Sequence, residues 1–236
     1  MTSGNSYTVA TALEGARQAL ALMGGDMSQA QVVVLGATGS IGAVCSRILA
    51  QEAKTVTLVA RNQERLQALA DELRLLNQAQ MRVTDNRAQA LREADVVLAV
   101  TSALDTIIEP GDLKAGAVVC DVARPRNVSR RVAEERPDVL VIEGGVVRVP
   151  GDVDFGFNFG FPPQTAYACM AETMILALEG RYESYTLGRE LSVGQIETIN
   201  QLAKKHHFQL AGFRNFERAV TPEEIAAIQA QAALAC

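Results

Sequence analysis

The sequence predicts an α/β fold, in which a doubly wound parallel sheet carries an added N-terminal helix and added C-terminal helices. Two observations support this fold class: unbroken apolar runs recur along the chain, and helical patterns of about 10 to 15 residues separate them. Apolar runs without polar alternation are typical of strands covered on both faces. Strands that alternate with helices form βαβ units, whose crossovers are right-handed.

The expected elements follow in chain order. A helical pattern over 7–24 precedes the sheet and is expected to pack on it. Helices are predicted after Gly42, over 64–76 and over 87–94. The predicted strands occupy 32–35, 55–60, 80–83, 95–103, the first part of 116–128, and 138–147.

Three glycines join the first predicted strand to the helix that follows it, in the order G-x-x-G-x-x-G. In a Rossmann-type dinucleotide turn, the first glycine permits the tight turn, the second admits the pyrophosphate, and the third permits close helix packing. The helix N-terminus adds donors for the phosphates. A glycine-rich turn without ligand is the alternative, but the flanking strand and helix favour dinucleotide binding. The expected contact residues are Gly36, Ala37, Thr38, Gly39, Ser40, Ile41 and Gly42.

The end of the second predicted strand indicates which dinucleotide binds. An NAD site usually has an acidic residue there, which accepts hydrogen bonds from the ribose hydroxyls. This chain has Arg61 and Asn62 instead. Arg61 can pair with a 2′-phosphate in a bidentate way, and Asn62 can add a donor. A solvated arginine is the alternative, although a cation at a helix start is slightly unfavourable. The sequence therefore favours NADP(H) over NAD(H).

Small polar residues end the next two predicted strands. Thr101 and Ser102 follow the fourth strand, and Asp121 ends the fifth. Ligands of such sheets lie at the carboxyl ends of the strands, so these side chains are expected to contact the ribose or the nicotinamide amide. Ordinary turn chemistry is the alternative for Ser102 and Asp121. Arg124 and Arg126 fit either a structural role or contact with an anionic substrate.

The composition changes after residue 150, where a Gly-rich loop contains four phenylalanines. Pro162 and Pro163 predict a helix start, since proline is tolerated in the first turn. The methionines and aliphatic residues of that helix suit either core packing or a lipid channel. The expected organisation is a leading helix in 1–28, an NADP-binding domain in 29–150, and a substrate side in 151–236.

The tail predicts two more helices, over 191–213 and 221–235. Thr221 and Glu224 form a capping-box pattern at the start of the second. His206 and His207 lie near the end of the first, where a histidine is commonly structural.

Composition limits the class of protein. The chain has 236 residues, of which 48% are hydrophobic, and a net charge of −5, which favours a soluble globular protein and argues against nucleic acid as a partner. We expect no membrane span, no signal peptide and a cytoplasmic location. The cysteines are scattered, so neither a metal site nor a disulfide framework is expected; they are Cys45, Cys120, Cys169 and Cys236.

Several segments carry a family resemblance. The chain resembles the cyanobacterial long-chain acyl-(acyl-carrier-protein) reductases along nearly its whole length. "DVARPRNV" also resembles the NADP domains of the glutamyl-tRNA reductase and shikimate dehydrogenase group. The segments that carry the closer resemblance are "TSGNSYTVA", "VVVLGATGSIGAVCSRILA", "LVARNQERLQAL", "VIEGGVV", "TAYACMAETMILALEGRYESYTLGR" and "HHFQL".

The resemblance implies a reaction. Members of the reductase family reduce a fatty acyl thioester, carried by acyl carrier protein or CoA, to an aldehyde with NADPH. They act through a cysteine thioester, and the matching residue here is Cys169. Apart from the resemblance, Cys169 would be interpreted as a buried core cysteine. It is expected to lie more than one turn into its helix, and Glu172 is expected to oppose its ionisation.

The family has an additional N-terminal portion ahead of the segment that matches "TSGN", and this chain begins at that segment. A truncated reductase, a short paralogue and a chain whose missing portion is supplied from elsewhere therefore all stay open. A homo-oligomer stays open as well. Two other functions stay open as well. One is a shikimate-type dehydrogenase acting on a small carbonyl or alcohol, a class that uses a lysine and an aspartate on a separate N-terminal domain. The other is a non-catalytic NADP-binding subunit.

Overall fold

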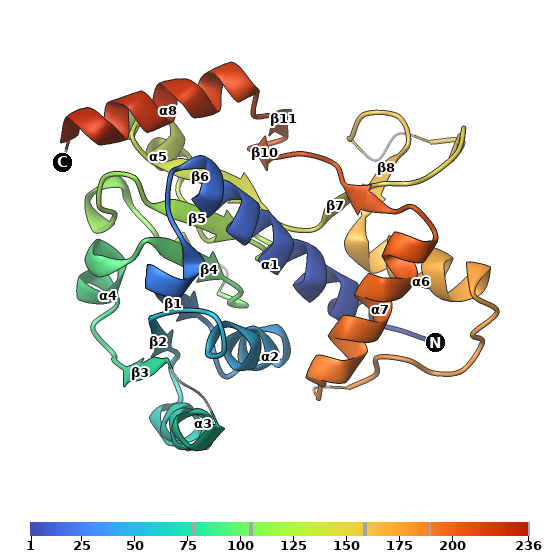
Figure 1. The fold of residues 1–236 in the computed structure, drawn as a ribbon, viewed down its shortest axis with the longest axis horizontal. Helices are drawn as coiled ribbons and strands as arrows, with labels where there is room; N and C mark the ends of the chain where they lie inside the picture. Colours follow the sequence, from blue (N-terminus) through green and yellow to red (C-terminus); the bar gives the residue numbers. More distant parts are fainter. Residues whose placement is uncertain (77–78, 104–105, 158–159, 189, 236) are drawn as a thin grey trace.

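A six-stranded parallel sheet forms the centre of the molecule (Figure 1). The computed structural model describes residues 1–236 except 77–78, 104–105, 158–159, 189 and 236. The strand order is β3-β2-β1-β4-β5-β6, which confirms the predicted doubly wound sheet. The strands are β1 (Gln31–Leu35), β2 (Thr55–Val59), β3 (Gln80–Val83), β4 (Val96–Ala99), β5 (Val118–Asp121) and β6 (Leu140–Glu143).

Helices cover both faces of this sheet, which explains why its strands are apolar without alternation. Val32 and Val34 of β1 point into one core, together with residues of the first three helices. Val33 and Leu35 point into the core on the other face, with residues of the next two helices. The first three helices are α1 (Asn5–Leu22), α2 (Ser40–Leu49) and α3 (Gln63–Leu76), and the next two are α4 (Arg87–Glu93) and α5 (Arg130–Glu135). Short 3₁₀ helices occupy Met27–Gln29 and Pro110–Asp112.

The strand order reverses between β1 and β4. The chain moves outward from β1 through β2 to β3, and α4 then returns it to the other side of β1. The loops after β1 and β4 therefore diverge, and a crevice forms at the carboxyl ends of these two strands.

The elements that follow β6 lie in two places in Figure 1: most form a unit to the right of the sheet, and the last helix runs across the top of the view. Strands β7 (Val146–Arg148), β8 (Thr165–Tyr167) and β9 (Gln209–Leu210) form an antiparallel sheet. Helices α6 (Ala168–Leu178) and α7 (Val193–Lys205) pack against α1, which joins this unit to the main sheet. A hairpin of β10 (Arg214–Asn215) and β11 (Arg218–Ala219) leads to α8 (Pro222–Ala235), whose predicted capping box from Thr221 and Glu224 is present.

Three expectations about this region are wrong. The helix predicted over 191–213 ends at Lys205, and β9 follows it. The apolar run over 138–147 is not one strand, because Gly144 and Gly145 separate β6 from β7. Pro162 and Pro163 do not begin a helix: the chain first forms β8, which pairs with β7, and α6 begins only at Ala168. Pairing between strands has therefore overridden the local signal of the two prolines.

Candidate active site

A cleft of about 1620 Å³ opens where the strand order reverses. It is larger than the pocket of roughly 300 to 1,000 Å³ that holds a drug-sized ligand. The glycine turn after β1, the start of α3, and the loop after β4 line this cleft. This is where doubly wound sheets bind their ligands.

Gly36 makes the tight turn at the end of β1. Its φ is +88°, and its N–H donates to the carbonyl oxygen of Val59 at 2.8 Å. A Cβ at this position would lie 2.9 Å from the Cα of Thr101. Both the left-handed conformation of Gly36 and the close approach of the chain that follows β4 therefore require glycine at this position.

Gly39 and Gly42 have different roles. Gly39 is exposed and lines the cleft, and it is the N-cap residue of α2. A Cβ on Gly42 would overlap the carbonyl oxygen of Gly36, so this glycine lets α2 pack against the turn. Thr38, Ser40 and Ile41 also line the cleft, whereas Ala37 and Gly42 are buried beneath it.

Ser40 carries a polar atom that fits a phosphate. Its Oγ is buried, and within the described residues it has no hydrogen-bond partner. The residue is the first of α2, where backbone N–H groups also lack intrahelical acceptors. A buried hydroxyl is rarely left unpaired, so an anion at the start of α2 would satisfy both kinds of donor.

The far end of the cleft is rich in arginine. Arg61 and Asn62 line it, as expected, and Asn62 also caps α3 by accepting from the N–H of Arg65 at 2.8 Å. Arg65 and Arg87 line the same end and were not anticipated from the sequence. Arg65 lies in the first turn of α3, directly after the segment of Arg61 and Asn62, and this position could have indicated it.

Thr101 and Ser102 line the cleft after β4. Thr101 Oγ1 donates to Asn127 Oδ1 at 3.0 Å, which fixes the Thr101 side chain. Asp121 does not line the cleft, because it is fully buried below it. Its carboxylate accepts from the N–H groups of Asn127 (2.7 Å), Val128 (2.9 Å) and Ala123 (3.0 Å). Asp121 therefore orders the loop that holds Thr101.

The opposite wall of the cleft comes from outside the parallel sheet. Asn5, at the start of α1, and Leu191, Ser192 and Gln195, around the start of α7, line it. The N-terminal segment and the C-terminal unit therefore complete a cleft whose floor belongs to the sheet.

Cys169 lies beside this wall. It is the second residue of α6 and is exposed. The expectation that Cys169 lies more than one turn into its helix is therefore wrong, because α6 begins after β8 and not at the prolines. Gly4, the N-cap residue of α1, packs so closely against it that a Cβ on Gly4 would overlap the backbone of Cys169.

Two opposed influences act on the thiol. Burial raises the pKa of Cys169 above its ordinary value, and the backbone N–H groups of Cys169 and Met170 lower it. The charge of Glu172 raises the pKa further, which confirms the expected opposition to ionisation. The net effect is a Cys169 pKa above the ordinary value for a thiol.

Glu172 itself is fully buried. Its Oε2 accepts from Ser6 Oγ at 2.5 Å and from the N–H of Tyr7 at 2.8 Å. Its Oε1 accepts from Thr186 Oγ1 at 2.8 Å and from Thr2 Oγ1. The carboxylate of α6 therefore caps α1, whose own N-cap residue has no side chain.

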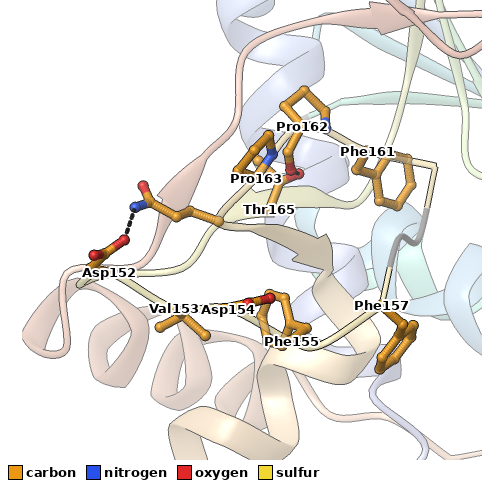
Figure 2. Close-up of a pocket in the computed structure, with 10 residues that line it drawn as sticks. Asp152, Val153, Asp154, Phe155, Phe157, Phe161, Pro162, Pro163 and Thr165 are labelled. Carbon is orange, nitrogen blue, oxygen red and sulfur yellow. Dashed lines mark hydrogen bonds between the residues drawn. The ribbon is translucent and has the colours of Figure 1, made fainter.

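A second pocket of about 440 Å³ lies in the loop between β7 and β8 (Figure 2). Phe155 and Phe157 border it from one arm of the loop, and Phe161, Pro162 and Pro163 from the other. Asp152 at one end accepts from Gln164 Nε2 at 3.3 Å. The ring of Phe161 meets that of Tyr167 edge-on, with centroids 4.6 Å apart. Since Tyr167 is the N-cap residue of α6, this contact connects the pocket to the helix start that bears Cys169.

Arg124 and Arg126 pair with one buried carboxylate. Arg124 Nη2 lies 3.1 Å from Glu143 Oε2, and Arg126 Nη2 lies 2.9 Å from Glu143 Oε1. Their guanidinium groups therefore have a structural partner at the end of β6.

No helix among the described residues is long and apolar enough to cross a membrane. The same residues contain no group of three or more histidine, cysteine or acidic side chains that could hold a metal ion.

Comparison with known proteins gives three kinds of match. Residues 17–143 match the family described as shikimate/quinate 5-dehydrogenase. A long-chain acyl-[acyl-carrier-protein] reductase from Synechococcus elongatus is 34% identical over 216 residues, and the match covers 88% of this chain and 61% of that protein. The aminotransferase PigE from a Serratia species is 32% identical over 216 residues, and the match covers 88% of this chain and 25% of PigE.

Among solved structures, glutamyl-tRNA reductase from Methanopyrus kandleri matches with a TM-score of 0.45 and 18% identity, covering 96% of this chain and 43% of that one. The predicted resemblance to the acyl reductases, and more broadly to the shikimate dehydrogenase and glutamyl-tRNA reductase group, is confirmed. The chain spans 61% of the reductase and smaller shares of the other two proteins.

Proposed function

Because the chain belongs to the family of shikimate and quinate 5-dehydrogenases, we propose that it is a nicotinamide-dependent oxidoreductase. More narrowly, we propose that it reduces a long-chain fatty acyl thioester, carried by acyl carrier protein or CoA, to a fatty aldehyde with NADPH. The acyl group passes through a thioester on Cys169. The similarity to a long-chain acyl-[acyl-carrier-protein] reductase supports the narrower proposal.

The cleft fits the proposed dinucleotide. Gly39 leaves room for the pyrophosphate, and the unpartnered Ser40 hydroxyl and the start of α2 supply donors to it. Arg61, Arg65 and Arg87, which line the same cleft, supply cations that suit a 2′-phosphate. When bound, the cofactor supplies a hydride.

The position of Cys169 carries the proposal. Its backbone touches Gly4, and the next residue, Asn5, lines the dinucleotide cleft. A carbonyl carbon bonded to the Cys169 sulfur would therefore lie at the edge of the cleft. An acyl-enzyme reductase needs this arrangement, because one carbon must be reached first by sulfur and then by hydride.

The proposed reaction at Cys169 consists of acyl transfer to the sulfur, reduction of the acyl group, and release of the aldehyde. The thiol of Cys169 attacks the acyl thioester, the bond from the acyl carbon to the carrier sulfur breaks, and the carrier leaves as its thiol. Addition of a hydride to the carbonyl carbon and a proton to its oxygen then gives a thiohemiacetal. Breaking of the bond from carbon to the Cys169 sulfur releases the aldehyde and restores the thiol.

The Phe-lined pocket supplies an apolar environment for the acyl chain. Burial of each CH₂ group contributes about 0.8 kcal/mol, so a long chain gains more than a short one. The contact between Phe161 and Tyr167 places this pocket next to the start of α6. The 151–236 region thus forms the substrate side in this proposal.

Mass spectrometry tests the proposal directly. After incubation with a long-chain acyl-CoA or acyl carrier protein, we expect an acyl adduct on Cys169 and, with NADPH, fatty aldehyde. Cys169→Ser should abolish aldehyde formation but keep NADPH binding, because the dinucleotide contacts lie in the cleft. Cys45 is buried, so Cys45→Ser is a matched control that should retain labelling at Cys169.

Each result has a distinct meaning. Labelling with aldehyde supports the reductase, and labelling without turnover supports a reductase that needs a further portion or partner. If NADPH binds and no acyl group ever reaches Cys169, the proposal is wrong, and a dehydrogenase acting on a small carbonyl or a non-catalytic NADP-binding subunit is the better account.

A further inference from the structure

Asn5 lies between the nucleophile and the dinucleotide cleft. It is the first residue of α1 and lines the cleft, while its neighbour Gly4 contacts the backbone of Cys169. Asn5 is therefore well placed to meet an acyl group on that sulfur.

The amide of Asn5 is not used to cap its own helix. Asparagine near a helix start commonly accepts from the backbone of the first turn. Here Glu172 of α6 takes that role, through the N–H of Tyr7 and the hydroxyl of Ser6. Within the described residues, the Asn5 side chain makes no hydrogen bond, so its amide is available to a ligand.

The other amide and the hydroxyl on this wall are engaged. Gln195 Nε2 donates to the carbonyl oxygen of Tyr185 at 2.8 Å, and its Oε1 accepts from the N–H of Ser192 at 3.0 Å. The hydroxyl of Ser192 accepts from the N–H of Gln195 at 3.2 Å. These bonds hold the start of α7 and leave Asn5 as the amide on this wall that is free to donate.

Acyl transfer to Cys169 and the later addition of hydride both place negative charge on the carbonyl oxygen of the acyl group. When sulfur attacks the carrier thioester, the carbonyl oxygen becomes an oxyanion, and it does so again when hydride adds to the acyl-Cys169. A fixed donor that stabilises such an oxygen contributes about 100- to 1,000-fold to the rate of acyl-transfer reactions.

We propose that the Asn5 side-chain amide donates a hydrogen bond to the carbonyl oxygen of the acyl group on Cys169. Glu172 is a positioning residue in this proposal, because it fixes the first turn of α1 against α6. The proposal rests on the proposed function, and it assigns a second group to the reaction of Cys169. No atom is transferred to or from Asn5, which only donates its N–H to the oxygen.

The experiment compares two reactions of the Cys169 sulfur in the absence of cofactor. Acyl transfer from a long-chain acyl-CoA creates an oxyanion, whereas alkylation by iodoacetamide displaces iodide and creates none. For Asn5→Ala we expect acylation to slow by about 100-fold and alkylation to change less than threefold. The urea midpoint should stay close to wild type. Asn200→Ala, a half-buried asparagine on α7 outside the cleft lining, is the matched control and should change neither rate.

Asn5→Asp extends the test, since a carboxylate has the size of the amide but repels an oxyanion. We expect acylation of this variant to be at least as slow as that of Asn5→Ala. Equal slowing of acylation and alkylation would overturn the proposal, because it would show that Asn5 only positions the cysteine. Wild-type acylation rates in both variants would overturn it while leaving the proposed function intact. A wild-type protein that alkylates but never acylates would overturn the proposed function, and the role of Asn5 with it.

Discussion

The backbone of Gly4 lies directly against the backbone of Cys169, with no room for a Cβ between them. This contact brings the start of α1 to the start of α6, although the two residues are far apart in the chain. Gly4 also has a φ of +75°, so both its conformation and its surroundings exclude other residues. Gly4 therefore keeps the start of α1, which lines the dinucleotide cleft at Asn5, in direct contact with the candidate nucleophile.

Gly4→Ala should test how firmly this contact is held. An alanine would carry the cost of a left-handed conformation and would push α1 away from α6, so we expect a loss of about 2 to 4 kcal/mol in the free energy of unfolding. Gly24→Ala is the matched control, because Gly24 has a φ of +81° but no backbone atom near its would-be Cβ. Urea denaturation measures both variants. Equal losses would show that the contact with Cys169 adds nothing.

Gly39→Val should separate cofactor binding from folding. Gly39 is exposed in the cleft, so the valine side chain would occupy the space of a pyrophosphate. We expect fluorescence titration to detect no NADPH binding, while circular dichroism shows nearly unchanged helix content. Gly42→Ala should instead lower the free energy of unfolding, because the alanine Cβ would overlap the carbonyl oxygen of Gly36. Normal NADPH affinity in the Gly39 variant would mean that the phosphates bind elsewhere.

Arg61→Ala should weaken NADPH binding by about 1.5 to 3 kcal/mol, the range for a hydrogen bond to a charged group. NADH has no 2′-phosphate, so its binding should barely change. Arg74→Ala is a suitable control, since Arg74 lies on α3, the helix that follows Arg61, pairs with Asp71 at 2.7 Å and does not line the cleft. Calorimetric titration with both cofactors decides the matter: an equal loss for NADPH and NADH, or a wild type that prefers NADH, would refute the assignment.

The sheet and the glycine turn were predictable because their signals are local. Strands buried on both faces must be apolar at every position, as in Val32–Leu35, and the spacing of Gly36 and Gly42 follows from a tight turn before a helix. The start of α6 was not predictable in this way. Strands β8 and β9 have three and two residues, too few to show a period, and the two prolines imitate a helix start.

The partners of Glu172 show why the remainder of the site needed the structure. Glu172 and Tyr7 are 165 residues apart in the chain, so no sequence pattern connects the carboxylate to the N–H group that it caps. The sequence likewise gives no pattern that connects Arg87 with Arg61, because Arg87 reaches the cleft from a separate helix, α4. Local spacing predicts elements and turns, whereas the meeting of side chains from separate elements depends on the packing of the whole fold.

The rate of alkylation of Cys169 should show how Glu172 affects the thiol. Burial and the charge of Glu172 raise the pKa of Cys169. Iodoacetamide reacts with the thiolate, so the rate should rise with pH and reach its midpoint above that of an ordinary thiol. In Glu172→Gln the charge is lost, and the hydroxyls of Thr2 and Thr186 can turn to accept from the new amide. The midpoint should therefore fall, and alkylation at neutral pH should become faster.

Glu179→Gln provides the control for this last measurement. Glu179 lies just beyond the other end of α6, where it pairs with Lys205 and His206, so removing its charge should leave the midpoint of Cys169 unchanged. A fall in both variants would point to a general effect of net charge, and no fall in either would show that burial alone raises the pKa. A fall confined to Glu172→Gln would show that the carboxylate that caps α1 also raises the pKa of the Cys169 thiol.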